Sequence, residues 1–231
     1  LLLGIVVCFG WVSLAGGAAQ HYSGHEKLDE NSLLYLVLIT MSLHGSILLA
    51  TAVALWWFHI SWGEAFGFTR GGTGRAMVLG ALAGVVFLPV GWMLQLLSGG
   101  ILNAMHRDVP VQEAVQTMQK ADTLDCRVYF VVFSIFIAPV AEEILFRGIL
   151  YPAIKQFGFP RSALWGTAVL FAAIHVNLPI FLPLLALGLA LALLYEATNN
   201  LLAPIAAHGL FNAVNIVVFY LNQDAPHPFH K

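Results

Sequence analysis

Residues 128–154 read VYFVVFSIFIAPVAEEILFRGILYPAI. This run is long enough to cross the roughly 30 Å hydrocarbon core of a bilayer as one helix. It nevertheless carries three charges within six residues, Glu142, Glu143 and Arg147. A charged side chain at the centre of a bilayer costs ~2.5–3.5 kcal/mol on insertion scales, so such residues pair with one another or serve a function. The stretch therefore predicts a transmembrane helix that also carries a functional site.

The composition of the whole chain agrees with a membrane protein. Of its 231 residues, 59% are hydrophobic and only 10% are charged, against about 25% charged in soluble domains. Five other stretches contain no Asp, Glu, Lys or Arg at all. They are 1–20, 31–63, 76–106, 162–195 and 197–223. We predict an all-α, polytopic transmembrane bundle that forms a single domain over residues 1–231, with membrane lipid around it. The net charge of −2 gives no basic surface for nucleic acid, so we expect no nucleic-acid partner.

The apolar stretches predict about seven spans, within a range of six to eight because prolines blur the boundaries. The predicted spans are Leu1–Ala19, Leu33–Trp57, Ala76–Leu97, Val128–Ile154, Pro160 to near Pro179, Ile180–Tyr195 and Leu201–Leu221.

The loops between these spans suggest an orientation. Loops 63–75 and 155–161 carry two basic residues each, whereas loop 21–32 is acidic. The positive-inside rule places the N-terminus and the two basic loops in the cytoplasm. We expect the protein in a plasma membrane of the bacterial type, and the side of the membrane on which the site opens stays undecided. Residues 108–110, Asp-Val-Pro, predict the start of a short amphipathic helix on the membrane surface or of an ordinary connector.

The three charges of the first stretch divide into two groups. Glu143 and Arg147 are four residues apart on a helix and can neutralise each other. Glu142 is rotated by about 100° from Glu143 and has no local partner. An unpaired carboxylate at membrane depth is a functional-site hypothesis.

Further polar residues lie deep in the predicted spans. His175 lies near the end of one span, and His208 and Asn212 lie in the last, four residues apart and therefore on one helix face. His44 and His59 lie in or near the second span. The ordinary alternative for each histidine is a hydrogen bond to a neighbouring carbonyl. For the asparagine it is an interhelical hydrogen bond, worth ~0.6 kcal/mol on average.

Together these residues favour hydrolysis. Glu142, His175 and His208 come from three spans and can share one water-filled cavity. A carboxylate can take a proton from water, and a histidine can orient that water or carry a second proton. A second histidine and the Asn212 amide can donate to a developing oxyanion. Glu142, His175 and His208 could instead hold a zinc ion with an open position for water.

Three motifs occur in a defined order, Glu142-Glu143-x-x-x-Arg147, Phe171-x-x-x-His175 and His208-x-x-x-Asn212. Over about residues 138–216, they resemble the CAAX prenyl protease type II and bacteriocin-processing family of intramembrane metalloproteases. The resemblance implies that Glu142 and His175 activate water, that His208 and Asn212 form an oxyanion hole, and that Glu143 and Arg147 support them. For the cofactor it leaves open both zinc and a glutamate mechanism without metal.

The same resemblance implies an endopeptidase that cleaves a membrane-associated peptide, including a prenylated CAAX-type peptide. Two other classes of function stay open. One is a non-catalytic scaffold or bacteriocin-immunity protein with the same fold. The other is a proton- or metal-coupled transporter, because intramembrane Glu and His residues also form relays, although the chain lacks the internal repeat common in transporters.

Overall fold

The computed structural model describes residue 10 and residues 32–69, 72–107, 113–120 and 123–221. Within these ranges every regular element is a helix, which confirms the all-α expectation. The elements are α2 (Leu33–Trp57), α3 (Trp62–Phe66), α4 (Thr73–Ala104), α5 (Glu113–Lys120), α6 (Leu124–Val132), η1 (Phe133–Ile137), α7 (Ala138–Glu143), η2 (Ile144–Leu150), α8 (Tyr151–Gln156), α9 (Pro160–Ala173), α10 (Leu178–Thr198) and α11 (Leu202–Leu221). The predicted first span, Leu1–Ala19, lies outside the described residues, as does the predicted helix start at 108–110.

Five helical stretches of the described residues are long and apolar enough to cross a membrane. They are α2, α4, the continuous stretch Leu124–Gln156, α10 and α11. The chain is therefore an integral membrane protein. The prediction of a span from Pro160 to near Pro179 is wrong, because α9 has 14 residues and rises only about 21 Å. The predicted span Ala76–Leu97 ends too early, since α4 continues to Ala104.

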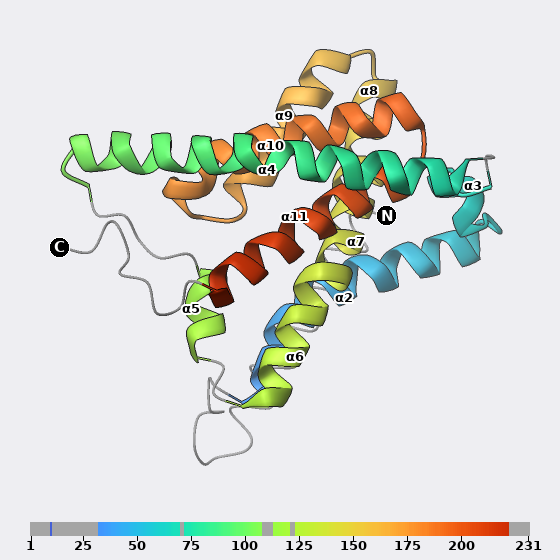
Figure 1. Cartoon of the computed structure of the whole chain (residues 1–231). Coiled ribbons are helices and arrows are strands. Elements are labelled where there is room, and N and C mark those ends of the chain that lie inside the picture. The colour runs from blue at the N-terminus through green and yellow to red at the C-terminus, as the bar shows by residue number, and fades with distance from the viewer. Residues whose placement is uncertain (1–9, 11–31, 70–71, 108–112, 121–122, 222–231) are drawn as a thin grey trace.

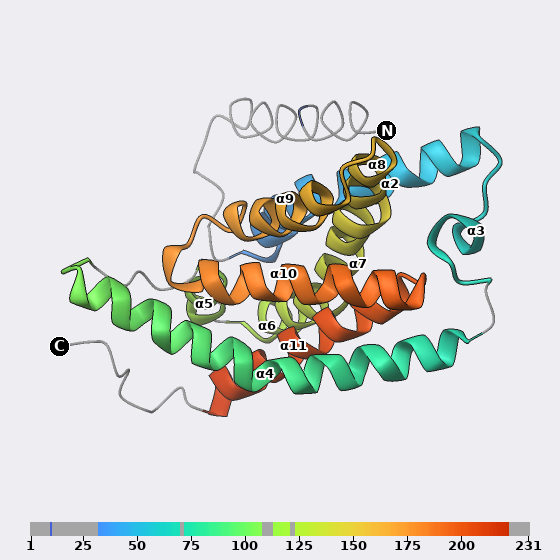
Figure 2. The same cartoon turned by 90° about the horizontal axis from the view of Figure 1, so that it is seen from above.

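The spanning helices form two packed groups. α4 lies against both α10 and α11, and α10 lies between α4 and α9 (Figures 1 and 2). In the other group, α2 packs against α6 and α7. α7 also contacts α11, so it joins the two groups. Polar side chains on α7 can therefore meet residues of both α2 and α11.

Small residues allow α4 and α11 to approach closely. A Cβ atom added at Gly80 would lie 2.2 Å from the carbonyl oxygen of Ala203, and one added at Gly84 would lie 2.8 Å from that of Ala207. Both glycines are buried, and they are one helical turn apart. Such small residues are typical of helix interfaces in membranes, where packing rather than the hydrophobic effect drives association.

We expect Gly80→Ala to destabilise the protein by about 1–3 kcal/mol, because the new methyl group would force α4 and α11 apart. The measurement is thermal unfolding of the purified protein in detergent. Gly100→Ala is the matched control, since Gly100 lies on the same helix and a Cβ there has nothing within 4 Å. It should leave stability unchanged or raise it by up to about 1 kcal/mol. Equal effects of the two substitutions would contradict this view of the interface.

The two basic loops meet at one end of α10. Asn200 donates from Nδ2 to the carbonyl of Gly67 at 3.0 Å, and the backbone N–H of Leu201 donates to Phe66. On the other side of the same end, Lys155 pairs with Glu196. The structure thus puts residues 63–69 and loop 155–161 at the same end of the bundle, as the shared basic character of the two loops predicts.

Candidate active site

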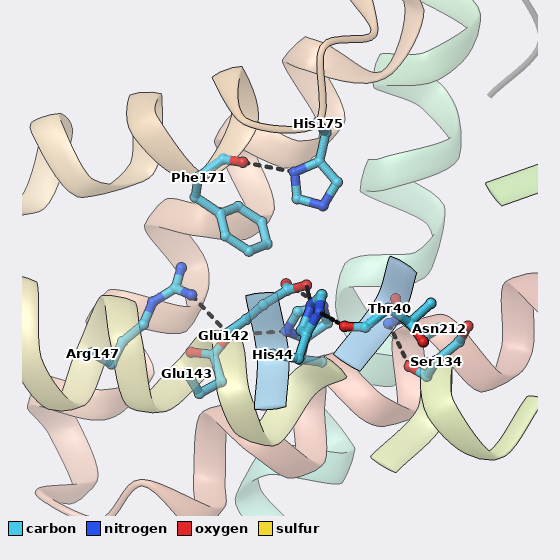
Figure 3. Close-up of polar contacts among 10 residues, drawn as sticks. Thr40, His44, Ser134, Glu142, Glu143, Arg147, Phe171, His175 and Asn212 are labelled. Carbon is cyan, nitrogen blue, oxygen red and sulfur yellow. Dashed lines mark hydrogen bonds and ion pairs between the residues drawn. The ribbon is translucent and has the colours of Figure 1, made fainter. Parts of the chain in front are cut away.

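Polar side chains from four elements converge around Glu142 (Figure 3). Glu142 lies on α7, near the middle of the spanning stretch Leu124–Gln156. His44 comes from α2, and His208 comes from α11. His175 lies two residues after the end of α9. The structure therefore brings together three of the residues that the sequence singled out for catalysis, and adds His44.

Two π-helical turns flank the segment that carries the glutamates. The N–H of Ala138 donates to Phe133, and that of Tyr151 donates to Phe146, five residues back in each case. A proline follows each of these donors, at positions 139 and 152. Proline has no N–H and its ring clashes with the carbonyl four residues back, so the helix widens there. Such π turns occur frequently at functional sites, and here they lie on either side of α7, which carries both glutamates.

The predicted ion pair between Glu143 and Arg147 is present and fully buried. Arg147 Nη1 donates to Glu143 Oε1 at 2.8 Å, and both side chains are 0% exposed. Nη2 donates to the carbonyl of Gly188 on α10, also at 2.8 Å. The guanidinium lies 4.9 Å from the ring centre of Phe171 on α9. The pair thus connects η2 to two other helices.

Glu143 also orients His208. His208 Nδ1 lies 2.9 Å from Glu143 Oε1, and a carboxylate beside a guanidinium acts as the acceptor, so Nδ1 carries the hydrogen. The Phe171 ring packs edge-on against the imidazole, with 5.7 Å between the ring centres. The second nitrogen, Nε2, consequently faces Glu142.

The two carboxylate oxygens of Glu142 have different surroundings. Oε1 lies 3.2 Å from His44 Nε2. Oε2 lies 3.8 Å from His208 Nε2, which is too far for a hydrogen bond, and no described residue bonds to it. The side chain is 13% exposed. One oxygen is therefore held in place, and the other is free to accept a proton from a bound molecule.

His175 completes the group on the side of α9. Its Nδ1 lies 2.7 Å from the carbonyl of Phe171 and must donate to it, because a carbonyl only accepts. Nε2 is then the free acceptor. Figure 3 shows the imidazole pointing toward Glu142. The ring is half-buried and packs against the Phe171 ring at 5.1 Å.

Asn212 lies apart from these groups, beside η1 (Figure 3). Its Nδ2 donates to the carbonyl of Ser134 at 2.9 Å. In a regular helix that carbonyl would accept from Ala138, and in a π turn it would accept from residue 139. Ala138 donates instead to Phe133, and residue 139 is a proline, so the Asn212 amide satisfies a carbonyl that the helix leaves free. The amide nitrogen carries a second hydrogen for another acceptor.

His44 is the site residue that sequence reasoning missed. The structure joins it to Glu142, while its Nδ1 also lies 2.9 Å from the carbonyl of Thr40, the ordinary contact expected from sequence. The available signal was a histidine inside an uncharged apolar stretch, but sequence alone does not show which way it faces. His59, weighed alongside it, lies exposed after α2 and outside the site.

The arrangement does not form the zinc site considered from the sequence. Among the described residues, no three His, Cys, Asp or Glu side chains gather in a way that could hold a metal ion. In the set Glu142, His175 and His208, Nδ1 of each histidine donates to a protein acceptor, which leaves Nε2 as the ring nitrogen that a metal could use. The described residues hold no assembled group of three such ligands, and we derive no step through a metal.

Comparison with known proteins gives a family match over the C-terminal half. Residues 125–214 match the family model described as "Type II CAAX prenyl endopeptidase Rce1-like". This segment contains every site residue named above except His44. No solved structure matches the chain.

Two curated proteins of Bacillus subtilis (strain 168) are similar to this chain. The protein named "Putative membrane peptidase YdiL" is 26% identical over 137 residues, which cover 58% of this chain and 56% of that protein. "Uncharacterized protein YpbD" is 34% identical over 88 residues, which cover 36% of this chain and 42% of that protein. The chain thus spans about half the length of these relatives.

Proposed function

Because residues 125–214 of this chain belong to the Rce1-like family of type II CAAX prenyl endopeptidases, we propose that the chain is an intramembrane endopeptidase. Its substrate is a peptide or lipidated peptide held in or at a bacterial-type plasma membrane. One observation carries the proposal. Glu142 presents a buried, unbonded carboxylate oxygen between histidines near the middle of a membrane-spanning stretch. Such an arrangement can activate water inside a bilayer, with the site carried by about residues 138–216 of one membrane domain.

Glu142 and His175 are the proposed water-activating residues. Glu142 Oε2 accepts a proton from the attacking water as general base, a role worth about 10²–10⁴-fold in rate. His175 Nε2 accepts a hydrogen bond from the same water and orients it, because Nδ1 is held by the Phe171 carbonyl. The water oxygen then bonds to the peptide carbon, whose carbonyl oxygen becomes the oxyanion.

His208 and Asn212 are the proposed oxyanion donors. A histidine donates from Nε2 only when that atom is protonated, and Nε2 of His208 lies 3.8 Å from the oxygen that took the proton of water. The proton passes to Nε2, and Glu143 stabilises the resulting imidazolium. The His208 imidazolium donates to the oxyanion and then protonates the leaving nitrogen as the C–N bond breaks. The second amide hydrogen of Asn212 adds a donor, and one such donor can be worth ~3–4 kcal/mol.

His175→Ala is expected to lower kcat by about 100-fold, because the water loses its orienting acceptor while Glu142 stays in place. The assay follows cleavage of a membrane-anchored peptide by the purified variant in lipid vesicles. His106→Ala, at an exposed position after α4, is the matched control and should match the wild type. A His175→Ala protein that is folded and fully active would rule out the proposed role.

The substrate class follows from a direct comparison. Prenylated CAAX peptides and plain peptides of the same sequence are offered to the purified enzyme. Preference for the prenylated peptides would support the CAAX assignment, and preference for plain peptides would remove it.

The zinc alternative is tested in the same assay by adding a chelator and measuring the metal content of the protein. A loss of activity that added zinc restores would favour zinc. A layout of six spans, the five described above and the predicted first span Leu1–Ala19, stays part of the proposal and can be mapped by labelling introduced cysteines.

A further inference from the structure

His44 lies outside the segment that matches the family, yet it makes the only hydrogen bond to the Glu142 carboxylate found among the described residues. We propose that His44 is a positioning residue that holds one proton on Nε2, so that Glu142 rests as a carboxylate able to accept a proton from water. This inference rests on the proposed function. It is argued from the direction of two hydrogen bonds, from the local charge and from the packing of the imidazole.

The two contacts of His44 require a proton between His44 and Glu142. Nδ1 lies 2.9 Å from the Thr40 carbonyl, which only accepts, so Nδ1 carries a hydrogen. In a neutral imidazole the other nitrogen, Nε2, then has a lone pair. Nε2 lies 3.2 Å from Glu142 Oε1, and two lone pairs at that distance repel. The pair must therefore share one proton.

The local charge independently requires the same proton. Two carboxylates, Glu142 and Glu143, face one guanidinium, Arg147, in a buried site. This leaves one negative charge without compensation, and an uncompensated buried charge is strongly destabilising. Among the described residues, the other titratable groups that face Glu142 are His208 on α11 and His175 after α9. Neither hydrogen-bonds to its carboxylate, so one proton between His44 and Glu142 neutralises the cluster where the geometry requires it.

The position of that proton decides whether Glu142 can act as a base. With the proton on His44 Nε2, Glu142 is a carboxylate and Oε2 can take a proton from water. With the proton on the carboxyl group, Glu142 has no capacity to accept another. Without His44, the proton needed for neutrality falls on Glu142 itself and blocks the reaction.

The surroundings of His44 hold its ring in this geometry. The Phe133 ring of η1 packs edge-on against the imidazole, with 4.9 Å between ring centres. Thr40, whose carbonyl binds Nδ1, is itself joined to Tyr129 of α6 through a contact of 2.5 Å between the two hydroxyl groups. The ring is thus fixed from α2, α6 and η1 together.

The test uses His44→Gln and His44→Ala in the full chain, with His59→Gln as the matched control. Glutamine can donate a hydrogen bond to Glu142 but cannot hold an added proton. We expect both His44 variants to lose about 100-fold in kcat, with KM within about two-fold because His44 does not touch substrate. His59→Gln, at an exposed position, should match the wild type.

Infrared difference spectroscopy gives a second readout that does not depend on cleavage. The band of a protonated Glu142 carboxyl, assigned by its loss in Glu142→Gln, should be absent from the wild type and present in His44→Gln. A protonated Glu142 in the wild type would overturn the inference even where no His44 variant folds. Full kcat in His44→Gln would also overturn the inference. A wild type that cleaves nothing would instead refute the proposed function, while the infrared result would still decide where the proton lies.

Discussion

Glu142→Gln is expected to abolish peptide cleavage, with kcat reduced by at least about 100-fold. Glutamine has nearly the same shape as glutamate and can keep a contact with His44, but it cannot accept a proton from water. The loss should fall on kcat, because Glu142 acts on the attacking water and its side chain is only 13% exposed in the resting site. The variant should stay folded, since the substitution also removes a buried charge.

The matched control for this substitution is Glu64→Gln. Glu64 lies in the short helix α3, where it forms a capping box with Ser61 outside the spanning stretches. Glutamine serves equally well in a capping box, so cleavage and stability should both match the wild type. Cleavage at the wild-type rate by a folded Glu142→Gln protein would contradict the general-base role.

Arg147→Met is the second large expected effect, and it concerns stability. Arg147 is fully buried and pairs with Glu143, which is also fully buried. Removing the guanidinium leaves the Glu143 carboxylate without compensation, and breaking such a buried pair costs about 3–5 kcal/mol. The substitution also removes the donor to the Gly188 carbonyl. The expected result is a markedly lower midpoint of thermal unfolding in detergent.

Two comparisons separate charge from packing. Lys155→Met breaks the ion pair between Lys155 and Glu196. The side chains of these two residues are 47% and 36% exposed, so the substitution should lower stability by less than about 1 kcal/mol. The double variant Glu143→Gln with Arg147→Met removes both charges and should recover much of the lost stability. A double variant no more stable than Arg147→Met would show that the guanidinium acts through packing instead.

The sequence predicted the long apolar helices closely. α2 has the predicted bounds, and α10 and α11 differ from theirs by at most three residues, because hydropathy and length alone define a spanning helix. It erred at α9, where the uncharged stretch continues from residue 162 to residue 195 but the helix ends at Ala173. Val176 has a positive φ of 46° just beyond, and the chain turns there before α10 begins. An apolar composition does not reveal such a turn.

Within the site, local spacing could be predicted and long-range pairing could not. The Glu143–Arg147 pair follows from a separation of four residues on a helix. The contact of His44 with Glu142 joins residues 98 positions apart. It depends on how α2 packs against α7, which no local pattern records. The bond from Asn212 to Ser134 likewise depends on a π turn before a proline.

The central claim is that this chain hydrolyses a peptide bond with water activated by Glu142. The most direct measurement is a single-turnover reaction of the purified wild type and Glu142→Gln with a membrane-anchored peptide, in water enriched in heavy oxygen. Mass spectrometry then reads the new carboxyl group. The account predicts that the wild type yields a product with one heavy oxygen in that group, and that Glu142→Gln leaves the peptide intact. An intact peptide with the wild type, or equal labelled product from both proteins, would contradict it.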